Sequence, residues 1–316
     1  MVFIQAEHDG RRIEKAMKKI LFLHPGKAYL PELLLYKNFF AEYEFFNCQE
    51  LTSYTWTDFD LIWQFMGVDG RFSKATSIPR IHEYASLSVG RGAKWKDTVK
   101  RHLNVKPSLR IFLNEEIRKR YGFHDDVPYC YRDMGVDTVF FHREKTAKKY
   151  DFVYVGHMGE ERGFAKVLDF FSHHPEKSLL LIGTPDEVLY QSYQRYDNLI
   201  FAGRIPYEMV PSLAREAEYA LNYIPNVYPY YLQTSTKLLE YVAMDLKIVT
   251  TDYAWVNAFE KRRKMRFYKI KEDFSDMDWE KLRTFPFCNS SVEDLQWKNI
   301  LERSRIRERL AELLGG

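Results

Sequence analysis

The chain has 316 residues, of which 46% are hydrophobic and 29% charged, so it is long enough for two domains and too apolar to be disordered. Its 47 basic residues nearly balance its 44 acidic ones, and a net charge of +3 gives no field that argues for a nucleic-acid partner. Cys48, Cys130 and Cys288 are odd in number and fit no zinc-finger spacing, which argues against a structural metal and favours a reducing cytoplasm.

The first half of the chain alternates predicted strands with predicted helices. Met17 followed by KKILFLHP looks like a natural start, so residues 1–16 are expected to form a flexible extension without the apolar stretch of a signal peptide. Apolar runs predict strands at 18–24, 60–67, 78–84 and 110–114, and longer amphipathic runs predict helices at 32–43, 94–103 and 115–123.

The second half of the chain starts this alternation again. Strands are expected at 150–156, 177–183, 198–205, 219–225 and 247–251, with a helix at 163–174 and further helical segments between the strands. Residues 292–314 carry apolar side chains at helical spacing and predict one amphipathic terminal helix. The pattern is that of an α/β protein with two doubly wound, Rossmann-like parallel sheets facing a cleft.

The segment TSTKLLEYVAMDLKIVTT, residues 234–251, places Glu240 early in a helix that must otherwise be buried. A carboxylate near a helix N-terminus can simply interact with the helix dipole, with Ser235 or Thr236 as the cap. Free amides at a helix start also bind anions, and a carboxylate nearby can bind sugar hydroxyls. The segment alone leaves both interpretations open.

Four stretches of the sequence, in this order, resemble motifs of the glycosyltransferases with the GT-B fold, in particular the large family 4 (glycosyl transferases group 1). They are MGVDTVFF at 134–141, YVGHMGEERGF at 154–164, STKLLEYVAMDLKIVTTD at 235–252 and LQWKNILER at 295–303. The resemblance implies an acceptor domain at 17–145, a nucleotide-sugar donor domain at 146–292, and a terminal helix at 293–316 that crosses back to the first domain.

In this family the loop after the first strand of the donor domain holds the donor diphosphate through an arginine and a lysine. By position, Arg162 takes the place of the lysine and His157 that of the arginine, although the same EER stretch on its own is typical of a solvated turn. The glutamate that matches Glu240 binds the ribose, and amides near Thr236 and Lys237 lie against the diphosphate.

Other matches to the family are local. Gly203, Ile205 and Tyr207 fall in the strand-turn-helix that borders the nucleobase, His82 resembles a histidine that contacts the transferred sugar, and Gly26 follows the first strand where the family has a glycine-rich loop. Ordinary packing explains these residues equally well. The family commonly has a second glutamate that touches the donor sugar; here that position is Leu232. Either the donor sugar is held differently, or the loop at 226–234 reaches it with Gln233, Thr234 or backbone groups.

These resemblances imply a glycosyltransferase that moves a sugar from a nucleotide-diphosphate sugar to a saccharide or lipid-linked saccharide, without metal or other cofactor and with retention of configuration. A nucleotide-sugar epimerase and a non-catalytic partner subunit are the alternatives. Residues 90–120 contain ten basic and three acidic residues together with Trp95, a pattern expected either for a solvated face or for peripheral contact with anionic lipid at the inner face of the membrane.

Overall fold

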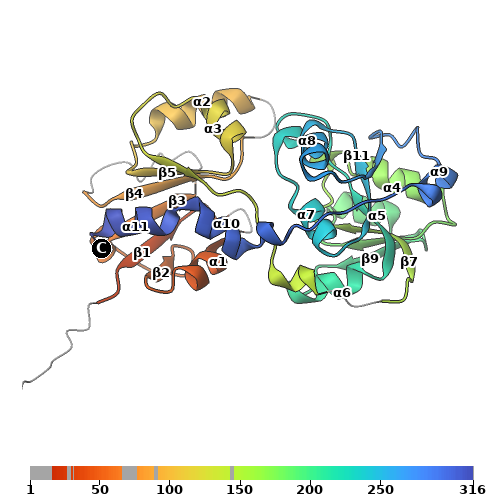
Figure 1. Cartoon of the computed structure of the whole chain (residues 1–316), viewed down its shortest axis with the longest axis horizontal. Helices are drawn as coiled ribbons and strands as arrows, with labels where there is room; N and C mark the ends of the chain where they lie inside the picture. Colours follow the sequence, from red (N-terminus) through yellow and green to blue (C-terminus); the bar gives the residue numbers. More distant parts are fainter. Residues whose placement is uncertain are drawn as a thin grey trace, which may run out of the picture.

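The structure is a computed structural model that describes residues 16–26, 30, 32–65, 77–88, 92–142 and 146–315. The expected extension at 1–16 lies outside the described residues except for its last residue. The described residues form two α/β domains side by side, each with a six-stranded parallel sheet (Figure 1). The predicted fold class is therefore confirmed.

The first sheet has the strand order β2-β1-β3-β4-β5-β6. Its strands are β1 (Lys19–Leu23), β2 (Glu44–Asn47), β3 (Leu61–Phe65), β4 (Arg80–Tyr84), β5 (Leu109–Phe112) and β6 (Tyr129–Tyr131), and its helices are α1 (Glu32–Phe39), α2 (Ala93–Leu103) and α3 (Glu115–Tyr121). β3, β4 and β5 are buried along their whole length, because helices cover both faces of a parallel sheet.

The second sheet has the order β12-β11-β10-β7-β8-β9. Its strands are β7 (Tyr150–Val155), β8 (Leu179–Ile182), β9 (Leu199–Gly203), β10 (Ala217–Asn222), β11 (Lys247–Thr251) and β12 (Tyr268–Ile270). Its helices are α4 (Ala165–Ser172), α5 (Glu187–Tyr193), α6 (Val210–Ala214), α7 (Thr236–Ala243), α8 (Ala254–Arg263) and α9 (Trp279–Thr284). The strand order reverses between β10 and β7, and ligands of such sheets bind at the carboxyl ends of the strands at that point.

The last two helices, α10 (Trp297–Ser304) and α11 (Ile306–Leu314), return to the first domain (Figure 1). Leu301, Ile306 and Leu310 are buried in the same cluster as the strands of the first sheet. The prediction of one terminal helix at 292–314 is wrong, because Arg305 has a left-handed backbone with φ of 60° and separates two helices.

Three further expectations about local structure need correction. The helix expected at 32–43 ends at Phe39, and α4 begins at Ala165, because Gly163 is left-handed with φ of 65° and ends a short 3₁₀ turn instead of opening the helix. Strands β2, β6 and β12 were not predicted. All three are edge strands of only 4, 3 and 3 residues, too short to show a hydrophobic period.

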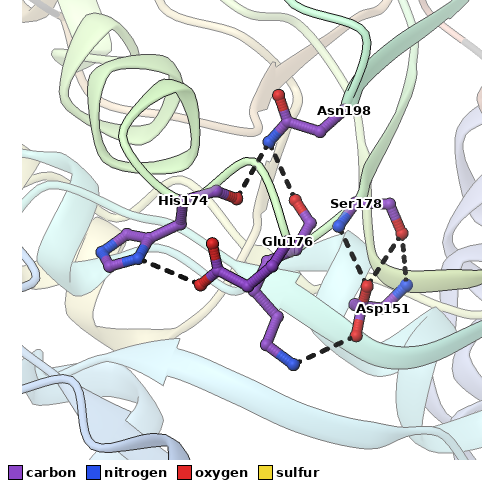
Figure 2. A network of polar contacts seen from close by, with 6 residues as sticks. Asp151, His174, Glu176, Ser178 and Asn198 are labelled. Carbon is purple, nitrogen blue, oxygen red and sulfur yellow. Dashed lines mark hydrogen bonds and ion pairs between the residues drawn. The ribbon is translucent and has the colours of Figure 1, made fainter.

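At the edge of the second sheet where the strands begin, side chains fix the turn between α4 and β8 (Figure 2). Asn198 Nδ2 donates to the carbonyl oxygens of Phe171, His174 and Lys177, and Asp151 accepts hydrogen bonds from the amide and hydroxyl of Ser178. This network satisfies the carbonyl group of Phe171 near the end of α4 and those of His174 and Lys177 in the turn that follows, at the edge of the sheet opposite the carboxyl ends of the strands.

Candidate functional site

A cavity of about 650 Å³ lies between the two domains, at the carboxyl end of β7. Its second-domain wall is formed by Val155, Gly156, Tyr207, Thr236, Lys237 and Glu240. Its first-domain wall is formed by Leu30, by Leu33, Leu34, Leu35 and Lys37 of α1, and by Asn47 and Glu50 at and after the end of β2. Met134, Gly135, Asp137 and Trp297 close the cavity where the chain passes between the domains. The cavity has the size of an ordinary small-molecule site.

The start of α7 forms the polar corner of this cavity. Ser235 is the N-cap, since its hydroxyl accepts a hydrogen bond from the amide of Leu238 and donates one to Asn222 Oδ1 at 2.7 Å. The next amides, of Thr236 and Lys237, have no acceptor within the helix. Both residues line the cavity, so an anion in the cavity could accept hydrogen bonds from their amides while Ser235 caps the helix. The two interpretations of this segment, a capped helix start and an anion site, are therefore compatible.

Lys237 carries a buried Nζ atom that has no hydrogen-bond partner among the described residues. This atom lies 3.8 Å from the centre of the Tyr154 ring, and a Cβ atom added to Gly156 would be 3.5 Å from it. Burial, and then the charge of Arg162, lower the pKa of Lys237 well below its usual value, while Glu240 acts in the opposite direction. An anion that enters the cavity would favour the charged form of this amine and pair with it.

Arg162 lies in the 3₁₀ turn Glu160–Arg162 and does not line the cavity itself. Its guanidinium lies 5.2 Å from the centre of the Tyr230 ring, and its Nε atom is 3.5 Å from a carboxylate oxygen of Glu161. Its charge affects the pKa values of both Lys237 and Tyr154. Arg162 and the start of α7 therefore lie on the same side of the second domain.

Glu240 lies in the second turn of α7, with only 8% of its surface exposed. Burial raises the pKa of its carboxyl group to about 8, and the charge of Asp137 adds to the increase. A 3.3 Å hydrogen bond from the Tyr207 hydroxyl and the charge of Lys237 lower this pKa but do not offset the burial. At neutral pH the carboxyl group is therefore mostly protonated. Ligand hydroxyls that donate to this group would favour its ionised form.

His157 does not point into the cavity corner formed by Lys237. Its Nδ1 atom is 3.2 Å from the carbonyl oxygen of Thr184, and its Nε2 atom is 3.7 Å from oxygens of both Glu161 and Asp186. His157 and Glu161 are exposed and Asp186 is half-buried, and their ligand atoms lie within 4.8 Å of one another, which makes them the candidate cation ligands in the described part of the chain.

His82, which resembles the family's sugar-contacting histidine, is the third residue of β4 and is fully buried. Burial, with the charges of Arg110 and Arg80, lowers the pKa of His82 to about 3. Within the described ranges neither ring nitrogen has a hydrogen-bond partner, and the residue does not line the cavity.

The three residues expected near the nucleobase separate in space. Tyr207 lines the cavity and reaches Glu240, whereas Ile205 lines a different depression of about 290 Å³ and Gly203 lines neither. Gly26 lies against the side chain of Gln49, also outside the cavity lining. Of the predicted site residues, the structure thus brings together Thr236, Lys237, Glu240 and Tyr207 in the cavity, with Arg162 nearby.

Sequence reasoning missed Tyr154, Trp297 and the leucines of α1 as parts of the site. Tyr154 belongs to a buried strand and gives no polar signal, and Trp297 was noted only as the start of the terminal helix. The leucines do leave a signal: in ELLLYKNF, apolar residues occupy three neighbouring positions of a helix, so they cannot all face the core.

Comparisons with known proteins identify the fold. No family model and no curated protein matches the chain. Among solved structures, Anabaena Alr3699/HepE in complex with UDP and glucose is 12% identical with a TM-score of 0.64, over 93% of this chain and 100% of its own. AviGT4, a glycosyltransferase involved in avilamycin A biosynthesis, is 15% identical with a TM-score of 0.54, over 94% of this chain and 97% of its own. A sucrose-phosphate synthase from Thermosynechococcus elongatus is 14% identical with a TM-score of 0.59, over 81% and 74%. At these identities the likeness shows the two-domain GT-B fold.

Proposed function

We propose that the protein is a glycosyltransferase that moves a sugar from a nucleotide-diphosphate sugar to a saccharide or lipid-linked saccharide acceptor. The observation that carries this proposal is the buried Nζ atom of Lys237, which has no hydrogen-bond partner in the described part of the chain and lies in the same cavity as Glu240 and the first residues of α7. A nucleoside diphosphate matches this corner, because it has an anionic group for the amine and amides and ribose hydroxyls for the carboxyl group.

Each residue would have a separate task in the transfer. Lys237, Arg162 and the amides of Thr236 and Lys237 would offset the negative charge that develops on the leaving diphosphate. Glu240 would bind the ribose, with Tyr207 beside it towards the base. With these groups as the source of positive charge the reaction needs no metal ion, and the family resemblance favours retention of configuration. His82 has no role in this proposal, since it does not line the cavity.

The acceptor side of the proposal rests on α2. Trp95 on this helix is 71% exposed, and Lys96, Lys100 and Arg101 lie on the same helix. An exposed tryptophan among basic residues suits peripheral contact with anionic lipid, where a lipid-linked acceptor and a cytoplasmic enzyme would meet. In the described residues, no helix has the length and apolar character needed to cross a bilayer.

Binding and hydrolysis of a panel of UDP-, GDP- and dTDP-sugars tests the function. Anabaena Alr3699/HepE, a solved structure similar to this chain, is in complex with UDP and glucose, so UDP is the first ligand to measure. We expect a nucleotide to raise the melting temperature, and Glu240→Ala and Arg162→Ala to weaken nucleotide binding while the proteins stay folded. If both variants bind like the parent, the site is assigned wrongly.

A non-catalytic partner subunit is the second candidate, and Leu232 favours it. This residue lies in the 3₁₀ turn Tyr230–Leu232, at the position where the family commonly has a glutamate that touches the donor sugar. Thr234, two residues on, uses its hydroxyl to donate a 2.8 Å hydrogen bond to Asp133 of the other domain. A protein that shows neither turnover nor a thermal shift with any nucleotide would fit this candidate.

A further inference from the structure

The two walls of the cavity differ in chemistry. The second-domain wall contains the amine, carboxyl group and amides described above, whereas the first-domain wall contains the leucines 30, 33, 34 and 35 together with three polar residues, Lys37, Asn47 and Glu50. Leu34 is 64% exposed, and Leu33 is half-buried. A ligand held by Lys237 and Glu240 therefore shares the cavity with four leucines, three of them on α1.

This helix face is held in a fixed position. Glu32 and Tyr36, which flank the leucines in α1, are buried. The Tyr36 hydroxyl donates to the Glu83 carboxylate at 3.1 Å, and Arg132, which pairs with Glu83, lies 3.6 Å from Glu32. Because these buried contacts determine where α1 sits, Leu34 is directed towards the cavity before any ligand arrives.

We propose that α1 forms an apolar cover for the nucleoside of the donor, with Leu34 and Leu33 packed on the face of the nucleoside opposite Tyr207. This inference rests on the proposed function and adds a contact from the first domain to the donor.

A nucleoside suits both walls better than a saccharide does. Its base has flat apolar faces and its ribose carries hydroxyls at one edge, so it can contact leucine on one side while its hydroxyls reach Glu240. A saccharide carries hydroxyls around its ring, and leucine would leave some of them without hydrogen-bond partners. The leucines line the same cavity as Lys237 and Glu240, so a single ligand can contact both walls.

The test measures UDP affinity by calorimetry for the parent, Leu34→Asp and Leu34→Met. We expect Leu34→Asp to raise the Kd by about tenfold or more, because it removes the apolar contact and places a carboxylate near an anionic ligand. Leu34→Met keeps the apolar contact and should bind like the parent.

Two matched controls separate the cover from general effects. Val188→Asp changes a side chain of the same exposure, 65%, on α5, and Asn38→Asp adds the same charge one turn further along α1; neither residue lines the cavity. Both should leave the Kd unchanged, and the melting temperature of each variant checks its folding.

The outcomes are distinct. If Glu240→Ala loses UDP binding while Leu34→Asp keeps it, the cover is refuted and the proposed function stands. An unchanged Kd with a raised KM for the acceptor would refute the cover too, and would assign Leu34 to the acceptor. If the parent binds no nucleotide, both the cover and the proposed function are wrong.

Discussion

The raised pKa of Glu240 makes a quantitative prediction about stability. The folded protein keeps a proton on this carboxyl group up to a pH of about 8, whereas the unfolded chain loses it near 4.5. Between these two pH values the folded state binds more protons, so stability falls as the pH rises, and the loss is complete above the folded pKa. This contribution is large because the residue is only 8% exposed.

Glu240→Gln removes this contribution and keeps the shape of the protonated side chain. The two pKa values predict the difference in free energy of unfolding between the parent and the variant at each pH. By linkage, this difference should favour the parent by about 2–3 kcal/mol more at about pH 6 than at about pH 9. The assay is urea unfolding of both proteins across this range, compared as a difference so that shared contributions cancel. Glu308→Gln, an exposed residue of α11, is the control. A difference between parent and Glu240→Gln that stays constant within about 0.5 kcal/mol across that range would refute a buried, protonated Glu240.

Three further predictions concern the contacts between the domains and the metal-free proposal. A Cβ at Gly135 would lie 2.6 Å from Trp297 Cδ2, so Gly135→Ala should lower stability by about 1–3 kcal/mol, and adding Trp297→Leu should recover part of that loss in urea unfolding. Arg132→Met should cost about 3–5 kcal/mol in the same assay, because it leaves the buried Glu83 carboxylate without its positively charged partner; an unchanged free energy of unfolding would refute this role of Arg132. Turnover should be unchanged by EDTA and by Asp186→Asn, whereas loss of activity that Mn²⁺ restores would assign a cation to the His157 cluster.

The alternation of strands and helices could be predicted because each central strand is a continuous apolar run. KIVTT gave the bounds of β11, Lys247–Thr251, almost without ambiguity, since a turn precedes it and a polar residue follows it. The start of α7 could also be predicted, with Ser235 or Thr236 as the cap before an apolar run, and the structure has Ser235 as the cap. The edge strands and the break at Arg305 could not, because pairing and backbone strain there depend on neighbours distant in sequence.

The site was predictable only where its chemistry is local. Lys237 and Glu240 are three residues apart on one helix, so the sequence places them together, but it does not show that Nζ is buried over Tyr154. That contact needs β7 and α7, which are about 80 residues apart, to meet at the reversal of strand order. His82 shows the converse error, since a motif-like histidine proved to be a buried strand residue.

One cluster of side chains around Arg132, where the chain passes between the domains, contacts elements of both walls of the cavity. Arg132 lies between β4, α1 and the start of α10: it pairs with Glu83, approaches Glu32 and lies 5.4 Å from the Trp297 ring. Trp297 in turn packs on Gly135, next to the cavity. A change at Arg132 therefore shifts α1 and the crossing helix together, although Arg132 does not line the cavity. If Arg132→Met binds the nucleotide more weakly than the parent, the side-chain cluster around Arg132 positions the two walls of the cavity. This conclusion holds because the substitution leaves Lys237, Glu240 and the other polar groups proposed to bind the ligand unchanged.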